Sequence, residues 1–270
     1  MQRATNCQRG LMCNLGMPAA PAPPLHWLES DSPFPPVHSA WGAETAAPGL
    51  LAAGGDLSVE RLVSAYSQGI FPWYSENQPI LWWSPSPRMV LQTAHFKLQR
   101  SLRKSWQHHL QHSELELSFD RSFDQVITHC AQAPRRQQAG TWIVPDMVRA
   151  YQRLHRAGFA HSVEARLQGQ LVAGLYFVCL GKAVFGESMF TQVSDGSKLA
   201  LAALVQVCQR HGIGMIDCQQ NTAHLASLGA AEIPREVFIH HIVQQQSKPS
   251  PDWAHETVES PSLPALSSPT

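Results

Sequence analysis

Apolar residues recur at helical spacing in several separate segments of the chain. Ser58 can cap a helix that runs to Gln68, with Leu57 and Leu62 placed as a hydrophobic staple and Gly69 as the stop signal. The same spacing predicts five further helices, over residues 97–112, 122–132, 145–157, 197–210 and 222–228. Helices therefore flank the middle of the chain on both sides.

Alternation typical of strands replaces the helical spacing between two of these helices. Three runs, at 161–166, 171–180 and 183–190, are separated by short turns and predict an antiparallel meander. Shorter apolar or alternating runs predict three more strands, near 89–92, 115–119 and 214–219. A meander followed by a helix, a strand and a helix predicts an α+β fold with a mixed sheet, an order similar to that of the acetyl-coenzyme A-dependent (GNAT-type) N-acetyltransferases.

Composition divides the chain into a body and two ends. Residues 1–30 are rich in alanine and proline, and residues 247–270 in serine and proline, so both are predicted to be disordered. Between them we expect a small N-terminal domain over 31–86 and an acetyltransferase-like catalytic domain over 87–246. Met1 and Met17 are both possible starts of the natural protein.

The charges of the chain balance, with 20 Lys and Arg residues against 20 Asp and Glu residues. A polyanionic partner would therefore need a local basic patch. Basic residues outnumber acidic ones by eight to four between residues 88 and 136, where Arg100, Arg103 and Lys104 lie on one predicted helix. Such a face is either simply solvated or a contact for nucleic acid.

Several classes of protein are disfavoured by what the sequence contains. The six cysteines match neither zinc-ligand spacing nor a disulfide framework, so we expect reduced thiols and a cytoplasmic protein. The histidines show no metal-binding helix pattern, and no metal is expected. No segment approaches the roughly 20 apolar residues of a membrane span, so no membrane association is expected.

A segment rich in tryptophan and proline follows the first helix, at residues 71–88. Its prolines exclude a helix interior, so Trp73, Trp82 and Trp83 are predicted to lie on a rigid, irregular surface suited to stacking on nucleobases. The alternative is that all three rings pack in the core, where tryptophan is usually well buried.

Polar residues interrupt two of the predicted strands. Strict alternation places Asp217 and Gln219 on one face of the last strand and Cys218 on the other, near a sheet edge where a cleft can form. Glu187 stands in an otherwise apolar strand, where a carboxylate is costly unless it is paired. Cys218 could be a nucleophile, but its expected orientation favours an inert core thiol.

Seven short runs together resemble one known family, and they span residues 34–243 in the family's order. The runs are GLLAAGGDLS at 49–58, GIFPWY at 69–74, PILWWSP at 79–85, GTWI at 140–143, GESMF at 186–190, IDCQ at 216–219 and HLASLGA at 224–230. They resemble the leucyl/phenylalanyl-tRNA–protein transferases, the aminoacyltransferases of the bacterial N-end rule pathway. Departures at 135–139, 192–196 and Gln220 touch peripheral positions.

The resemblance implies transfer of leucine or phenylalanine from aminoacyl-tRNA to the α-amine of proteins that begin with Arg or Lys, which marks them for degradation. It implies that Trp73 and Trp142 sandwich the 3′-terminal adenosine. It places Arg100, Arg103 and Lys104 at the acceptor stem. The amino-acid side-chain pocket would be lined by Met189, Ile216, Leu175 and Leu204, and the reacting centre by Glu187, Asp217 and Gln219.

No cofactor and no metal are expected, because an aminoacyl ester is already activated. We expect Asp217 to orient Gln219, the Gln219 carbonyl to accept a hydrogen bond from the incoming amine, and Glu187 to hold the amino group of the aminoacyl moiety. The alternatives are an acyl-coenzyme A-dependent N-acyltransferase of the same fold and a non-catalytic tRNA-binding module. A peptidoglycan-type aminoacyltransferase is more distant. The acyl-coenzyme A-dependent enzyme would need a loop that binds the anionic pyrophosphate. Residues 192–197 resemble such a loop poorly, because they contain one glycine and the acidic Asp195.

Overall fold

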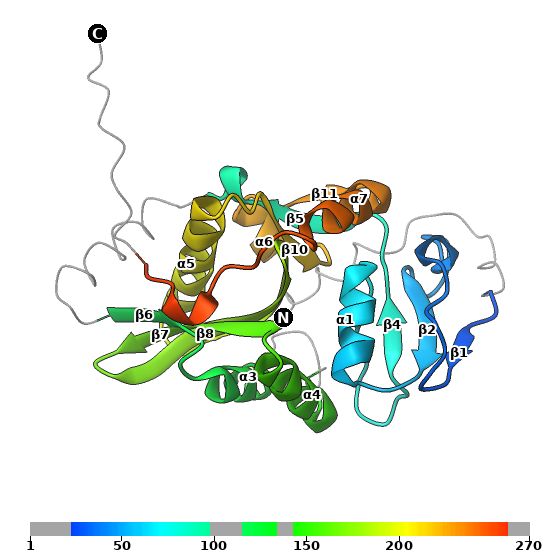
Figure 1. Cartoon of the computed structure of the whole chain (residues 1–270), viewed down its shortest axis with the longest axis horizontal. Coiled ribbons are helices and arrows are strands. Elements are labelled where there is room, and N and C mark those ends of the chain that lie inside the picture. Colours follow the sequence, from blue (N-terminus) through cyan, green and yellow to red (C-terminus); the bar gives the residue numbers. More distant parts are fainter. Residues whose placement is uncertain (1–22, 98–114, 134–142, 259–270) are drawn as a thin grey trace, which may run out of the picture.

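Two β-sheets, with helices against them, make up the fold in a computed structural model (Figure 1). The structure describes residues 23–97, 115–133 and 143–258. The helix expected at 97–112, with Arg100, Arg103 and Lys104, lies outside these ranges apart from its first residue, and so does Trp142.

The smaller sheet has the strand order β1-β2-β4-β3. Its strands are short: β1 (His26–Leu28), β2 (Leu50–Gly54), β3 (Phe71–Pro72) and β4 (Leu81–Trp83). Helix α1 (Val59–Ser67) packs beside them. Ser58 caps its N-terminus, as predicted, because the Ser58 side chain accepts a hydrogen bond from the Arg61 amide. β1 pairs in parallel with β2, so the prediction that residues 1–30 are disordered is wrong for this strand.

Two of the three tryptophans expected on an irregular surface are in fact core residues. Trp82 and Trp83 lie on β4, opposite Ala52 and Leu50 of β2, and both are buried. Their indole N–H groups donate to the backbone carbonyls of Gly54 and Trp73, at 2.9 and 2.6 Å. The prolines flank β4 instead of interrupting it, so a short strand forms between them and the packing alternative holds for these two rings.

The larger sheet has the order β11-β5-β10-β9-β8-β7-β6 and is antiparallel except for the β9–β10 pair. The strands are β5 (Arg88–Gln92), β6 (Leu115–Phe119), β7 (Ala160–Leu167), β8 (Gln170–Leu180), β9 (Ala183–Thr191), β10 (Met215–Gln219) and β11 (Ala231–Ile233). The meander β7-β8-β9 agrees with the alternation in the sequence. The expected α+β fold with a mixed sheet is confirmed.

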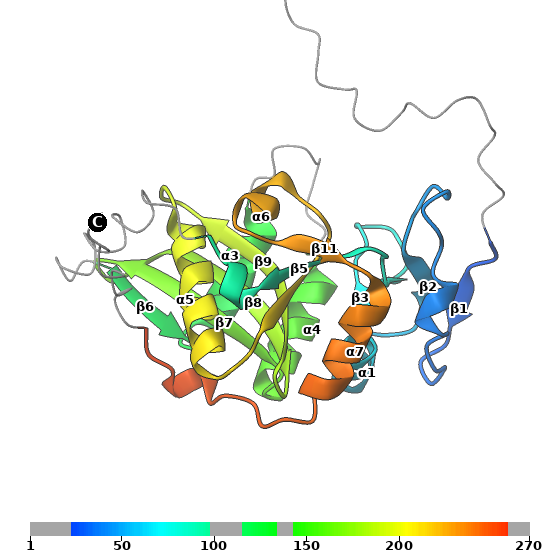
Figure 2. The same ribbon diagram turned by 90° about the horizontal axis from the view of Figure 1, so that it is seen from above.

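Helices cover both faces of this sheet (Figures 1 and 2). α3 (Phe123–Gln132) and α4 (Pro145–Arg156) pack on one face with α1, and α5 (Gly196–Arg210) packs on the other. α6 (Ala223–Ser227) follows β10, and α7 (Arg235–Gln245), which the sequence analysis did not predict, follows β11. None of the described helices has the length and apolar character that a bilayer crossing needs.

The segment after residue 246, predicted to be disordered, is ordered as far as residue 258. Trp253, in a short 3₁₀ helix (Trp253–His255), is buried against the rings of Phe119, Phe177 and His161. The expectation of a disordered tail from 247 is therefore wrong for residues 247–258. A serine- and proline-rich composition did not reveal the single large apolar side chain that anchors the segment.

The predicted boundary between residues 86 and 87 falls between the last strand of the smaller sheet and the first strand of the larger one. One cluster of buried residues nevertheless crosses it, joining Leu51, Tyr66 and Trp82 to Tyr151 and Phe185. The two sheets thus share a core, and their division into domains stays a prediction.

Candidate active site

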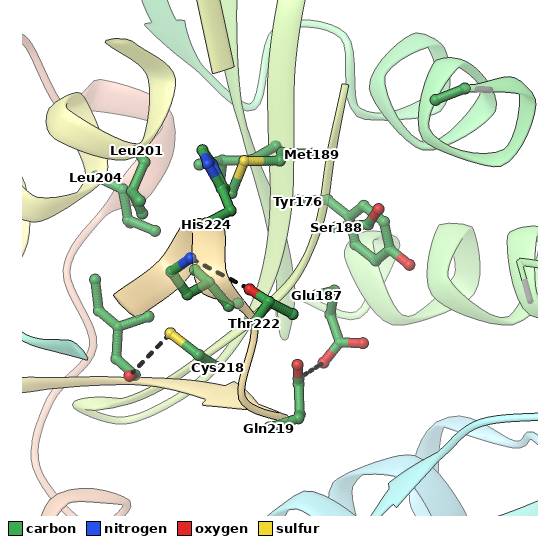
Figure 3. Close-up of a pocket in the computed structure, with 15 residues that line it drawn as sticks. Tyr176, Glu187, Ser188, Met189, Leu201, Leu204, Cys218, Gln219, Thr222 and His224 are labelled. Atoms are coloured by element: carbon green, nitrogen blue, oxygen red, sulfur yellow. Dashed lines mark hydrogen bonds between the residues drawn. The ribbon is translucent and has the colours of Figure 1, made fainter. Parts of the chain in front are cut away.

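A cavity of about 300 Å³ opens where strands β9 and β10 separate (Figure 3). These parallel strands pair only through Ile216 with Val184 and Asp217 with Phe185. Past those pairs, residues of both strands line the cavity, together with side chains from β8, α5 and α6. Crevices of this kind, at the carboxyl ends of parallel strands, are common ligand sites.

One end of the cavity is apolar. Six of its side chains come from five different elements, namely Leu175, Met189, Leu201, Leu204, Ile216 and Leu225. Figure 3 shows Leu201, Leu204 and Met189 at the opposite end from Glu187 and Gln219. The structure therefore brings together all four side chains expected to form an amino-acid pocket, and adds Leu201 and Leu225.

Two β-bulges determine where the side chains at the polar end of the cavity point. On β9, Tyr176 faces Ser188 and Phe177 faces Gly186, which leaves Glu187 as an extra residue without a partner on β8. On β10, Asp217 faces Val90 and Gln219 faces Met89, which leaves Cys218 extra on that edge. A bulge re-aims the side chains beside it. Glu187 and Gln219 consequently meet, with the Gln219 Nε2 donating to the Glu187 Oε1 at 3.1 Å.

The Glu187 carboxyl group receives two further hydrogen bonds, from tyrosines on two helices. The Tyr66 hydroxyl of α1 donates to Oε1 at 2.7 Å, and the Tyr151 hydroxyl of α4 donates to Oε2 at 3.3 Å. The two hydroxyls also lie within hydrogen-bond distance of each other, and because each carries a single proton, the tyrosines can donate only two of these three hydrogen bonds at one time. Burial, together with the nearby charge of Asp217, raises the pKa of Glu187 to about 8 despite these donors. Glu187 can therefore exchange a proton near neutral pH.

Asp217 does not share a face with Gln219, contrary to the expectation from strict alternation. Its carboxylate is buried on the other side of the strand, where Arg88 binds it through Nε and Nη2 at 2.8 and 2.6 Å. The bulge and a positive φ of 56° at Gln219 break the alternation. The Asp217 Oδ1 nevertheless accepts the Gln219 backbone N–H at 3.0 Å. Asp217 thus contacts the backbone of Gln219, and it is not among the described residues that line the cavity.

Cys218 lines the cavity and also packs against the core cluster that contains Ile216 and Leu228. Burial, and then the charge of Asp217, raise the pKa of its thiol far above the usual value. The thiolate needed for nucleophilic catalysis is therefore disfavoured, so the expectation of an unreactive thiol stays in place.

Trp73 lies outside the cavity lining and is only partly buried, so part of its surface is accessible. Its ring centroid is 5.3 Å from that of Trp83, at an interplanar angle of 61°. A second, more open cavity of about 550 Å³ lies between the smaller sheet and α4. It is lined in part by Trp27, Asp56, Tyr74 and Arg153. It contains none of the candidate catalytic side chains.

One group of potential metal ligands occurs among the described residues, formed by Asp120, His155 and His161, whose ligand atoms lie within 4.8 Å of one another. Two of its ring nitrogens are already used: the His161 Nδ1 bonds to Asp120 at 2.6 Å and the His155 Nδ1 to the Ala160 carbonyl at 2.7 Å. None of its three residues lines the cavity. We assign it to the packing around Trp253.

Comparison with known proteins identifies the family. The family model described as leucyl/phenylalanyl-tRNA protein transferase matches residues 90–243, and the model of that family's N-terminal domain matches residues 55–86. A leucyl/phenylalanyl-tRNA–protein transferase from Polaromonas sp. strain JS666 is 58% identical over 89% of this chain and 98% of its own. One from Paraburkholderia xenovorans is 56% identical over 84% of this chain and 93% of its own.

The chain belongs to the leucyl/phenylalanyl-tRNA–protein transferase family. Like the transferases it matches, it is an aminoacyltransferase that uses leucyl- or phenylalanyl-tRNA and a protein acceptor. The predictions of family, reaction and enzyme class are confirmed. A non-catalytic tRNA-binding module and an acyl-coenzyme A-dependent enzyme are set aside.

Solved structures give only distant matches to this transferase. L-PGS from Bacillus licheniformis has a TM-score of 0.35 at 10% identity, covering 61% of this chain and 51% of that chain. A ribosomal-protein-alanine N-acetyltransferase from Brucella melitensis has a TM-score of 0.30 at 14% identity, covering 54% and 98%. Scores below 0.5 support no conclusion about the site.

Three polar residues of the transferase site were not found from the sequence. Tyr66 and Tyr151 stand at ordinary buried positions of amphipathic helices, and no local signal marks the hydroxyl groups that meet Glu187. Arg88 stands directly before three buried apolar residues of its strand, and an arginine beside such a run is a signal of a buried, paired charge.

Replacement of Glu187 by glutamine should make stability depend less on pH. A carboxyl group with a pKa of 4.5 when unfolded and about 8 when folded stabilises the protein less as pH rises through that window, because only the folded state keeps the proton. Between pH 5 and pH 8.5 we expect Glu187→Gln to gain roughly 2 to 4 kcal/mol in unfolding free energy relative to the native protein. Urea unfolding at both pH values measures this. A difference that stays constant with pH would show that Glu187 titrates normally.

Proposed function

We propose that this transferase adds leucine or phenylalanine to the α-amine of proteins that begin with Arg or Lys, in the cytoplasm, and so marks them for degradation. The family membership supports the donor and the reaction, and the acceptor follows from the resemblance of the motifs. The observation that carries the assignment of the site is the cavity at the β9–β10 divergence, apolar at one end and closed by Glu187 and Gln219 at the other.

The apolar end suits the leucyl or phenylalanyl side chain of the donor. With that side chain among Leu175, Met189, Leu204 and Ile216, the α-carbon substituents face the polar end of the cavity. Glu187 then binds the α-amino group of the aminoacyl moiety. Because a neighbouring cation favours the carboxylate form, the arrival of the ammonium group would lower the pKa of Glu187 and ionise it.

Gln219 serves the acceptor. Its amide nitrogen donates to Glu187, which leaves the carbonyl oxygen to accept a hydrogen bond from the incoming α-amine. The neutral amine attacks the ester carbonyl, and an amide bond forms as the bond to the 3′-terminal ribose oxygen breaks. The proton lost by the amine passes to that ribose oxygen. A free α-amine has a pKa of about 7.7 to 8.0, so a useful fraction is neutral at pH 7.

Positioning should supply most of the rate enhancement. Holding two reactants at near-attack geometry contributes as much as roughly 7 to 11 kcal/mol, whereas general base assistance contributes about 10²- to 10⁴-fold. The hydrogen bonds from Tyr66, Tyr151 and Gln219 fix the Glu187 carboxyl group before substrate binds. Such a fixed polar end needs little reorganisation during the reaction.

We propose that the acceptor end is the part of the tRNA that binds at the site. Trp73 and Trp142 would hold the terminal adenosine, since stacking on an aromatic ring contributes roughly 1 to 3 kcal/mol per base. Trp73 is held in place for this role. Trp83 contacts the Trp73 ring, and the Trp73 backbone N–H donates to the Leu81 carbonyl. Arg100, Arg103 and Lys104 would contact the acceptor stem through its phosphates.

Enlarging the apolar end should change the choice of amino acid. Leu204→Ala is expected to raise the ratio of phenylalanine to leucine transfer by about tenfold or more, because the fit of a single methylene-sized group in an apolar pocket is worth roughly 1 to 3 kcal/mol. Competition between the two charged tRNAs measures the ratio, and some methionine transfer is expected from both proteins. Val207→Ala, on the same helix but outside the cavity lining, is the matched control. A native preference for isoleucine or valine would contradict the pocket assignment.

The direct test of the function supplies the purified chain with labelled leucyl- or phenylalanyl-tRNA and a model protein that begins with arginine. Label should transfer to that protein. The same protein with an acetylated N-terminus should receive none, because its α-amine is blocked. Equal labelling of a protein that begins with alanine would overturn the proposed acceptor preference.

A further inference from the structure

Arg88 lies at the centre of the buried contacts beneath the candidate active site. It is fully buried, and its guanidinium group lies over the rings of Phe71 and Phe238 at 4.7 and 4.6 Å. Two of its nitrogens bind both oxygens of Asp217, and the third, Nη1, donates to the Gly69 carbonyl at 3.2 Å. All three nitrogens of the guanidinium group therefore have partners, in the planar geometry that only arginine provides.

One arm of this arrangement leads to Gln219. The Asp217 Oδ1 that binds the Arg88 Nε also accepts the backbone N–H of Gln219. Gln219 sits just past the bulge with a positive φ of 56°, a conformation that non-glycine residues adopt only when their surroundings hold them in it. The Asp217 carboxylate supplies that constraint, and Arg88 fixes the carboxylate.

The other arm leads to Tyr66. Gly69 ends the turn after α1, and its N–H donates to the Tyr66 carbonyl at 3.0 Å. Tyr66 in turn donates from its hydroxyl to Glu187, which also receives the Gln219 amide. The contacts thus form a closed circuit from Arg88 through Asp217, Gln219, Glu187, Tyr66 and Gly69 back to Arg88.

We propose that Arg88 is a positioning residue of the transfer reaction, which holds Gln219 and Tyr66 on either side of Glu187 by binding Asp217 and the Gly69 carbonyl. This inference rests on the roles proposed above for Glu187 and Gln219. Arg88 stands on β5, which pairs with the strand that carries Gln219, and it is fully buried and outside the cavity lining, so it acts without touching substrate. Its hydrogen bond to the Gly69 carbonyl makes the end of α1 part of the catalytic geometry.

The charges of the buried pair also act on Glu187. Burial is the largest cause of the raised pKa of Glu187. In addition, the charge of Asp217 raises this pKa and the charge of Arg88 lowers it. The pair therefore holds Gln219 while its two charges act in opposite directions on the pKa of Glu187. An acidic residue alone at position 217 would hold Gln219 only by adding an uncompensated negative charge beneath the site.

Two variants test the proposal, so that the test does not depend on a single variant being able to fold. Arg88→Lys keeps the charge but loses the planar fork, and we expect at least a tenfold lower single-turnover transfer rate per folded molecule. The double variant Arg88→Met with Asp217→Leu replaces a buried ion pair by apolar side chains of similar size, which is often neutral for stability. We expect it to fold, to keep its KM for aminoacyl-tRNA within threefold, and to transfer at least 100-fold more slowly.

Arg61 provides the matched control. It is also a buried arginine, held by the backbone carbonyls of Glu29, Ser30 and Ser32 and lying 5.1 Å from the Phe34 ring centroid, but it has no contact with the circuit. Arg61→Met should lower the melting temperature and leave the transfer rate per folded molecule within threefold. A purely structural role for Arg88 predicts the same pattern for its variants.

The outcomes separate this inference from the proposed function. If both Arg88 variants transfer within threefold of the native rate, Arg88 is not a positioning residue. If Gln219→Ala and Glu187→Gln are slow in the same assay, only the inference fails. If those two variants are also fast, the proposed roles of Glu187 and Gln219 fail and the inference fails with them.

Discussion

Gln219→Ala is expected to lower the single-turnover transfer rate by about 100-fold or more at saturating aminoacyl-tRNA. The change removes the carbonyl oxygen proposed to bind the incoming amine and the Nε2 donor that bonds to Glu187 at 3.1 Å. It leaves the apolar end of the cavity intact, because Leu175, Met189 and Leu204 are untouched. Rapid-quench measurement with labelled phenylalanyl-tRNA gives the rate, and filter binding gives the tRNA affinity.

Gln220→Ala is the matched control for this experiment. Gln220 is the next residue, carries the same side chain and is exposed to solvent outside the cavity lining. We expect its rate to stay within twofold of the native protein. A Gln219→Ala rate within threefold of native would show that the acceptor amine is bound by another group.

Trp253→Ala is expected to lower the free energy of unfolding by about 3 to 5 kcal/mol, the range for truncating a buried large aromatic residue. Trp253 is 1% exposed, and its ring packs against Phe177 at 4.7 Å and Phe119 at 5.8 Å between centroids. None of these residues lines the 300 Å³ cavity. The transfer rate of the folded protein at low temperature should therefore change little.

Urea unfolding of the variant measures this effect. Trp27→Ala is the control, since Trp27 is 64% exposed, and a surface substitution usually changes stability by no more than about 0.5 kcal/mol. If Trp253→Ala cost less than 1 kcal/mol, residues 247–258 would not be an integral part of the fold.

The large sheet could be predicted from the sequence because its strands are long and their alternation is regular. The runs assigned to β7, β8 and β9 differ from the structure by no more than a residue or so at each end. The smaller sheet was missed because its strands are two to five residues long, and β4 is flanked by prolines. The order of residues 247–258 was missed because one buried side chain, Trp253, outweighs an unstructured composition.

The site was predictable only in part, for a related reason. Alternation placed Asp217 and Gln219 on one face, but the bulges at Glu187 and Cys218 depend on how β8 and β5 pair with their neighbours. Register of this kind is a tertiary property that a single strand does not encode. The partners of Glu187 and Asp217 likewise come from distant segments, so Tyr66 and Arg88 had no local signature as site residues.

The resemblance of motifs supplied what spacing alone did not. It named Leu175, Met189, Leu204 and Ile216 as one pocket although they lie on four different elements, and the structure places all four around one cavity. Its expectations for Trp142, Arg100, Arg103 and Lys104 fall outside the described residues and stay predictions.

A crystal structure with a non-hydrolysable phenylalanyl-adenosine amide would test the central claim most directly. The account predicts the phenyl ring among Leu175, Met189 and Leu204, the α-amino group within hydrogen-bond distance of Glu187, and the adenine against Trp73. A ligand bound instead in the 550 Å³ cavity beside Trp27 and Arg153, away from Glu187 and Gln219, would contradict it.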